Sequence, residues 1–242
     1  MRVFYALIGI LALAGCIVYM APATLLAVAL GEEGPVRLTE ARGRIWDGAA
    51  AVSHRGHALG SLSWQFAPAG LLQGQAHFDW LLAGAGHSLS GRVGLGFGGL
   101  RCLAEGTVRE AAVRRILAPY WIETAGDIGI ERIGLDATYD LHLQDLAGEL
   151  SWSGGEVRYR LSGEHYRMVL PSLAGVLESS DAKPALTVSA HGIDTPLLHV
   201  RLGADGWLTI GVTKKMTKMA GFPWPGNDPD HAIVIDVSER LF

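Results

Sequence analysis

The sequence is poor in charged residues and in cysteine. Only 18% of its 242 residues are charged, against roughly 25% in ordinary soluble proteins. Its 20 Lys and Arg residues are scattered and are outnumbered by 24 Asp and Glu, so a basic footprint for nucleic acid is missing. Cys16 lies inside an apolar run and Cys102 far outside it, which argues against a disulfide framework and a cysteine-based zinc site. The 49% hydrophobic content excludes intrinsic disorder.

Recognisable catalytic and ligand-binding motifs are also missing. None of the nine His residues occurs in an H-E-x-x-H pattern. Residues 86–91 carry Ser where a nucleophile elbow needs its second Gly, and residues 94–99 lead into a strand-like segment instead of a phosphate-binding helix. Asn227, Asp228 and Asp230 are interrupted by a proline, which favours an exposed turn over a calcium loop. We therefore expect a protein that is not an enzyme and has no cofactor or metal.

A long apolar run occupies the N-terminus, from Val3 to Leu30, and Thr24 is its only clearly polar side chain. A helix of that length exceeds the roughly 30 Å hydrocarbon core of a bilayer. We expect an uncleaved transmembrane helix over residues 3 to about 25, within an anchor of residues 1–30, with residues 31–242 outside the cytosol. Two alternatives stay open: a lipobox at residues 13–16, with a lipidated Cys16, and cleavage after residues 21–23.

Beyond Leu30 the dominant sequence period is two. Apolar and polar side chains alternate over residues 133–144, which predicts one half-buried strand. Helical periodicity is confined to Glu110–Leu117, with a further turn or two expected over Leu170–Leu177. Without repeated helical crossovers the strands should run antiparallel, so the predicted fold class is all-β, a curved, mainly antiparallel sheet or flattened sandwich behind one transmembrane helix. Shorter alternating segments predict strands at 61–66, 75–80, 198–202, 208–212 and 233–237.

Two short elements rich in Gly and Trp echo each other. Residues 43–48 (GRIWDG) precede a strand-like segment, and so do residues 148–154 (GELSWSG), which form an element one residue longer. The echo raises the hypothesis that the β domain, residues 31–242, contains two related halves, about 36–125 and 126–242. Chance similarity among glycine-rich strands explains the echo equally well.

A basic and aromatic cluster lies near the C-terminus. We interpret it as a solvated loop, and a surface for a partner or for lipid headgroups is the alternative. Its members are Lys214, Lys215, Met216, Lys218, Met219, Phe222 and Trp224.

The order of the Gly and Trp elements resembles that of the type II secretion system protein N family, also called general secretion pathway protein N. That family opens with an inner-membrane anchor, a G-x-apolar-W-x-G element and an L-G-x-apolar-x-W strand, followed by a Leu-rich step and a G-R pair. The resemblance is clearest over residues 1–100 and is diffuse to about 160. The family-motif residues, expected to be structural, are Gly43, Trp46, Gly48, Gly60, Trp64, Gly148, Trp152 and Gly154.

The resemblance implies an accessory component of the apparatus that exports folded proteins across the outer membrane of Gram-negative bacteria. It implies a single-pass inner-membrane protein, with most of the chain in the periplasm, that contacts other secretion subunits and has no catalytic residues. The alternative is a lipid-binding or lipid-transfer protein of the envelope, similar to the AsmA-like bridge proteins. An open groove lined by Leu, Val, Phe and Trp would favour lipid, whereas a filled interior would favour a scaffold.

Overall fold

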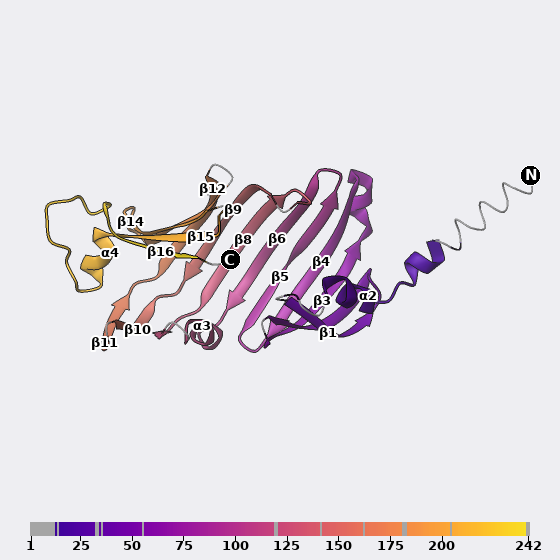
Figure 1. Cartoon of the computed structure of the whole chain (residues 1–242), viewed down its shortest axis with the longest axis horizontal. Coiled ribbons are helices and arrows are strands. Elements are labelled where there is room, and N and C mark those ends of the chain that lie inside the picture. The colour runs from indigo at the N-terminus through magenta and orange to yellow at the C-terminus, as the bar shows by residue number, and fades with distance from the viewer. Residues whose placement is uncertain are drawn as a thin grey trace, which may run out of the picture. The chain divides into compact units, whose positions relative to one another are not determined.

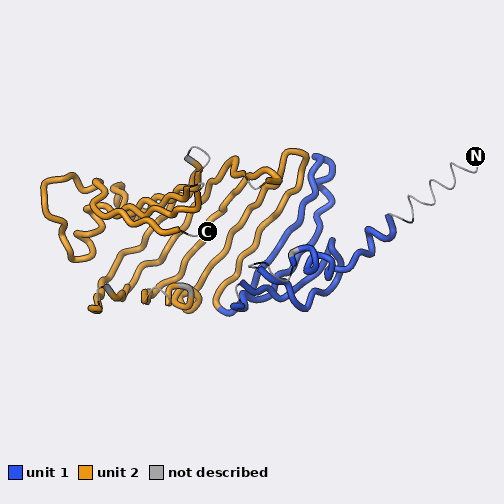
Figure 2. The backbone as a smooth tube through the Cα atoms, in the orientation of Figure 1, with its two compact units in different colours: residues 1–85 blue, residues 86–242 orange. Residues whose placement is uncertain are grey.

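The computed structural model shows a chain built mainly of antiparallel strands (Figure 1), which confirms the all-β prediction. The chain divides into two compact units, residues 1–85 and 86–242 (Figure 2). This division does not test the hypothesis of two related halves, which stays a prediction. The structure describes residues 13, 15–31, 34, 36–54, 56–118, 121–140, 142–161, 163–180, 183–203 and 205–240.

Unit 1 is an antiparallel meander with strand order β1-β2-β3-β4. The predicted strands at 61–66 and 75–80 are confirmed within β3 and β4, where Leu62, Trp64 and Phe66 pair with apolar residues of β4. Its elements are α2 (Thr24–Leu30), β1 (Val36–Gly43), β2 (Asp47–His54), β3 (His57–Ala67), the 3-10 helix η1 (Pro68–Gln73) and β4 (Gln75–Gly84).

Unit 2 holds two antiparallel groups of strands in its described residues. One runs in the order β5-β6-β8-β9-β12-β13-β14-β15-β16, and the other is a small sheet with the order β11-β10-β7. Its elements are β5 (His87–Gly96), β6 (Gly99–Val108), α3 (Glu110–Leu117), β7 (Ile122–Thr124), β8 (Ile128–Ala137), β9 (Leu143–Trp152), β10 (Gly155–Leu161), β11 (Glu164–Leu170), β12 (Leu173–Ser180), β13 (Lys183–Ala190), β14 (Pro196–Leu202), β15 (Trp207–Thr213), α4 (Lys214–Met219) and β16 (Ile233–Arg240).

One face of the larger unit 2 sheet is aliphatic along much of its width. Directly paired residues lie on the same face of a sheet, so the strand register assigns the faces. We call this surface the aliphatic face. It is half-buried, and its paired residues include Ile130 with Leu150, Leu177 with Leu186, Leu198 with Val212, and Val200 with Ile210.

The predicted single strand over residues 133–144 is wrong, because a turn divides it. Strand β8 ends at Ala137, and β9 begins at Leu143. Thr138 forms the turn, since its N–H donates to the His142 carbonyl at 3.0 Å and its hydroxyl accepts from the His142 N–H at 3.1 Å. The alternation of apolar and polar residues continues through the turn, which hid it from the sequence pattern.

Of the two predicted helical segments, one is confirmed and the other is wrong. Helix α3 confirms the one over Glu110–Leu117, with an acidic residue in its first turn and two Arg in its last, as the helix dipole favours. The helical turns predicted over Leu170–Leu177 are wrong. Pro171 and Ser172 link β11 to β12, and residues 173–178 pair with both β9 and β13, so ladder hydrogen bonds replace helical ones.

The apolar run does not form one helix as far as residue 25. Residues 1–12 and 14, which include about half of the predicted span, lie outside the described residues. Residues 15–19 are helical, but the helix ends at a turn at Met20, and Pro22 forms an isolated bridge with Arg44 before α2 begins. Proline lacks an N–H and so interrupts a helix. In the part of the chain that the structure describes, no helix is long and apolar enough to cross a bilayer.

Candidate interaction surfaces

Two glycines make the tight turn between β1 and β2 possible. Gly43 has φ +86°, and a Cβ there would stand 2.4 Å from the Asp47 carbonyl oxygen. A Cβ at Gly48 would stand 2.6 Å from the Arg42 carbonyl oxygen and 2.7 Å from Cζ2 of Trp64. The first family-motif element is therefore a backbone turn that any side chain at these positions would disrupt.

Trp46 connects this turn to the N-terminal segment and to the strands behind it. Its indole Nε1–H donates to the Val18 carbonyl at 2.9 Å. Its ring meets the Phe66 ring edge-on at 5.4 Å and stacks with the Phe78 ring at 6.3 Å. Trp64 stabilises the same turn, because its Nε1–H donates to the Ile45 carbonyl at 3.1 Å. Both tryptophans thus make hydrogen bonds within the chain, as the structural role predicted for them requires.

Gly60 allows β3 and β4 to approach closely. Its φ is +124°, and an added Cβ would stand 2.2 Å from the Ala83 carbonyl oxygen of β4. A contact that short cannot be relieved by moving a flexible side chain, because the obstacle is backbone. The position therefore accepts only glycine without a shift of the strand.

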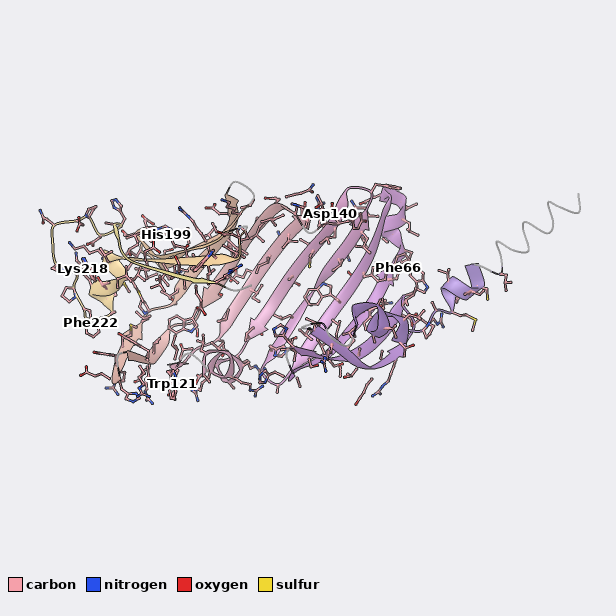
Figure 3. All side chains as sticks on the ribbon, in the orientation of Figure 1. Phe66, Trp121, Asp140, His199, Lys218 and Phe222 are labelled. Carbon is pink, nitrogen blue, oxygen red and sulfur yellow. The ribbon has the colours of Figure 1, made fainter. Side chains whose placement is uncertain are left out.

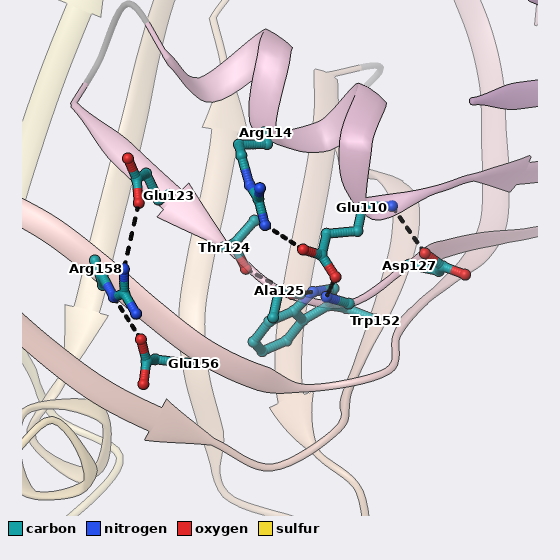
Figure 4. Close-up of polar contacts among 10 residues, drawn as sticks. Glu110, Arg114, Glu123, Thr124, Ala125, Asp127, Trp152, Glu156 and Arg158 are labelled. Atoms are coloured by element: carbon teal, nitrogen blue, oxygen red, sulfur yellow. Dashed lines mark hydrogen bonds and ion pairs between the residues drawn. The ribbon is translucent and has the colours of Figure 1, made fainter. Parts of the chain in front are cut away.

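The second element, Gly148, Trp152 and Gly154, holds the end of β9 and its link to β10. A Cβ at Gly148 would stand 2.8 Å from Cα of Ile133. Trp152 donates from Nε1 to the Ala125 carbonyl at 3.0 Å (Figure 4). Gly154 has φ +81°, and its Cβ would collide with the link that precedes β12. The chemistry repeats that of the first element, although the place in the fold differs.

The same region contains the N-terminal end of α3. The Glu110 backbone N–H donates to Asp127 Oδ1 at 2.8 Å, which satisfies one of the free donors of the helix (Figure 4). Arg114 pairs with the Glu110 carboxylate one turn later. These contacts are structural, because they join the start of α3 to the segment before β8 and to the helix itself.

Unit 2 contains an open groove of about 1070 Å³ across β5, β6, β8, β9 and β12. Its lining mixes polar and acidic side chains with aliphatic ones, of which Leu103 and Val176 are exposed. This lining contains the Leu and Val expected for an acyl chain, but it has four Glu residues and, among the described residues, no Phe or Trp. The polar side chains include Ser88, Ser90, Glu105, Thr107, Glu149 and Glu178.

Strand β16 forms an open edge of the larger sheet. Within the described ranges it pairs with β15 alone, so its other side offers backbone donors and acceptors. Ile233, Ile235 and Val237 are 52%, 36% and 51% exposed, respectively. Most of the remaining side chains of this strand are also exposed. An edge that combines unpaired backbone with exposed β-branched residues is a surface that another strand can join.

The solvated loop predicted over the basic cluster is wrong for its first half. Residues 214–219 form α4, which contains Lys218, and Phe222 follows shortly after the helix (Figure 3). Lys214 is only 4% exposed, and its ammonium donates to the carbonyls of Gly226 at 2.6 Å and Asp228 at 3.0 Å. Phe222 remains half exposed and meets the Tyr166 ring edge-on at 5.2 Å.

The Asp230 carboxylate, beside this cluster, forms ion pairs with two of its lysines. Asp230 contacts both Lys215 and Lys218, and the Lys218 ammonium lowers the pKa of the Asp230 carboxyl. The carbonyl of Asp228 already accepts from Lys214. No group of three His, Cys, Asp or Glu side chains with metal-site geometry occurs among the residues that the structure describes.

Titratable groups elsewhere are perturbed by ordinary structural causes. The Arg101 guanidinium donates twice to the Asp136 carboxylate at 2.7 Å and lowers the pKa of that carboxyl. Burial raises the pKa of the Cys102 thiol, which disfavours the reactive thiolate.

Comparison with known proteins gives one family. The sequence model of the type II secretion system (T2SS) protein N family matches residues 34–223, which is most of the chain. No curated protein and no solved structure is similar enough to count as a match. The matched range begins before β1 and ends after α4, so it covers both Gly and Trp elements and confirms the resemblance that they indicate.

Proposed function

Because the chain belongs to the type II secretion system protein N family, we propose that this accessory secretion component works as a docking subunit in the periplasm. It is held at the inner membrane by its N-terminal apolar run. It assists export of folded proteins by binding other secretion subunits and carries out no chemical step. The length and hydropathy of residues 3–30 support the membrane location, and family membership supports the partners.

The open edge of β16 is the observation that carries this proposal. A partner strand placed along it would gain main-chain hydrogen bonds whatever its sequence, and the exposed Ile235 and Val237 would add apolar contacts. The charged Asp236 and Glu239 limit indiscriminate pairing, since charges at an edge oppose the approach of an apolar strand. The edge therefore suits a selective partner.

Charge placed on the apolar side of this edge tests the proposal. The double variant Ile235→Lys/Val237→Lys should fold, because both side chains are exposed, but should lose crosslinks to secretion subunits and reduce export. Val169→Lys is a matched control, because Val169 is 72% exposed on β11, which is an edge strand of the small sheet. Export and crosslinking at the wild-type level in a stably produced double variant would refute docking through β16.

A second candidate, lipid binding, is supported by the aliphatic face of unit 2. A half-buried aliphatic surface of this kind can cover acyl chains. The open groove is lined by Ile130 and Leu177 of this face, but also by Glu side chains, whose desolvation beside an acyl chain would be unfavourable. Mass spectrometry of the purified chain decides between the candidates: stoichiometric phospholipid without a protein partner would favour lipid carriage, and lipid-free protein that crosslinks to secretion subunits would favour docking.

A further inference from the structure

The N-terminal helical segment enters unit 1 without a flexible linker. Its last described helical bond joins the Met20 N–H to the Cys16 carbonyl at 2.9 Å. Immediately afterwards, the Ile45 N–H donates to the Ala21 carbonyl, and the Ala23 N–H donates to the Gly43 carbonyl, both at 3.0 Å. The end of the helical segment and the β1–β2 turn are therefore held together as one piece.

The exposed side of α2 is mainly apolar, although Thr24 is also exposed. Ala23, which precedes the helix, is 1% exposed, and Leu26 and Ala27 are half-buried. Leu25 and Val28 are 52% and 77% exposed. The helical segment before α2 exposes apolar side chains too, since Leu13, Ile17, Val18, Tyr19 and Met20 are each at least 50% exposed. This apolar exposure is unfavourable in water and favourable in lipid.

The residue types around this surface suit the boundary between lipid and water. Arg44 places its guanidinium 4.8 Å from the centre of the Tyr19 ring, and Trp46 reaches the Val18 carbonyl with its Nε1–H. Tyr and Trp collect at membrane interfaces because one end of each side chain is apolar and the other polar. These three side chains lie where the helical segment ends and α2 begins.

The length of the apolar run indicates how deep α2 lies relative to the bilayer. A helix over residues 3–20 would rise about 27 Å, against roughly 30 Å of hydrocarbon. Such a span would need all of these residues, so the segment that follows it would begin at the membrane surface. We propose that α2 lies in the bilayer interface, with Leu25 and Val28 inserted between the lipids, so that unit 1 docks directly on the membrane surface. The inference rests on the proposed anchor and adds to it a second lipid contact.

Site-specific fluorescence on the full chain in phosphatidylethanolamine and phosphatidylglycerol vesicles tests the inference. In a Cys16→Ser/Cys102→Ser background, an environment-sensitive dye is attached at Leu25→Cys or Val28→Cys. Leu72→Cys is the matched control, because Leu72 is a 93% exposed leucine on η1 of the same unit. Ile17→Cys reports on the anchor itself. Nitroxide-labelled lipids of shallow and deep position then measure depth.

We expect the dyes at positions 25 and 28 to shift to the blue and to lose more fluorescence with shallow than with deep nitroxides, as a depth of about 5–10 Å requires. The dye at position 72 should show neither change. Quenching at 17 with water-like spectra at 25 and 28 would overturn the docking of α2 and leave the anchor intact. Water-like spectra at all three positions would overturn both the anchor and the inference.

Discussion

Replacing Trp46 tests the structural role of the first family-motif element. Trp46→Phe keeps an aromatic ring beside Phe66 and Phe78 but removes the donor to the Val18 carbonyl, which should cost about 0.5–1.5 kcal/mol. Trp46→Ala also removes both ring contacts. We expect about 3 kcal/mol, the lower end of the range for a core Trp, because the Trp46 side chain is only half-buried.

Hydrogen exchange of the β1–β4 amides is the appropriate measurement, since a chain of two compact units has no single unfolding transition. A loss of 3 kcal/mol speeds exchange through unfolding of unit 1 by about 100-fold, and a loss of 1 kcal/mol by about fivefold. Trp207→Ala in unit 2 is the control and should leave these amides unchanged. If Trp46→Ala abolished export without faster exchange in unit 1, Trp46 would be a partner contact and the structural reasoning would fail.

Three further changes test other parts of the fold. Gly60→Ala should destabilise unit 1 by about 1–3 kcal/mol. Gly56→Ala should destabilise it less, because a Cβ added at position 56 meets open space, and hydrogen exchange of the unit 1 amides compares the two variants. Lys214→Met should speed limited proteolysis of the loop whose carbonyls it holds. Arg101→Gln should speed hydrogen exchange of the β6 and β8 amides only slightly at neutral pH, because the Arg101 side chain is 61% exposed and solvent screens its pair with Asp136. Since the pKa of Asp136 is lowered on folding, this contribution exists above about pH 4 and disappears as the pH falls through the folded pKa, so variant and wild type should converge in acid.

The sequence predicted those features that depend on local pattern. Period-two alternation located β3, β4, β14, β15 and β16, and the 3.6 period located α3. Side-chain alternation records only the face on which each residue lies, so it carries no information about where a strand reverses. The turn after β8 uses the Thr138 hydroxyl in place of Gly or Pro, and for that reason the pattern ran through it unbroken.

The sequence-based errors near the termini had different causes. Pro22 was a visible helix-breaking signal, but the hydropathy of the surrounding run outweighed it in the prediction. The burial of Lys214 was not visible at all, because the two carbonyls that accept from it belong to residues 12 and 14 positions later and come close only in the fold. A buried ammonium can be predicted only when its acceptors are known.

Which strand forms the open edge of the larger sheet depends on the order of its strands, so the sequence of one strand alone does not reveal it. After β9 the chain leaves the larger sheet for β10 and β11, and it returns as β12 on the open side of β9. Each later strand then adds to its predecessor until the described strands end at β16. Several inner strands carry a glycine where a neighbouring backbone comes close, as Gly106 does beside the Ser88 carbonyl, but β16 contains no glycine. Beyond a register shift near Ile233, residues 235–240 pair with β15 one for one, so this stretch can accept an added strand without a change in its own backbone, which is the property that docking requires.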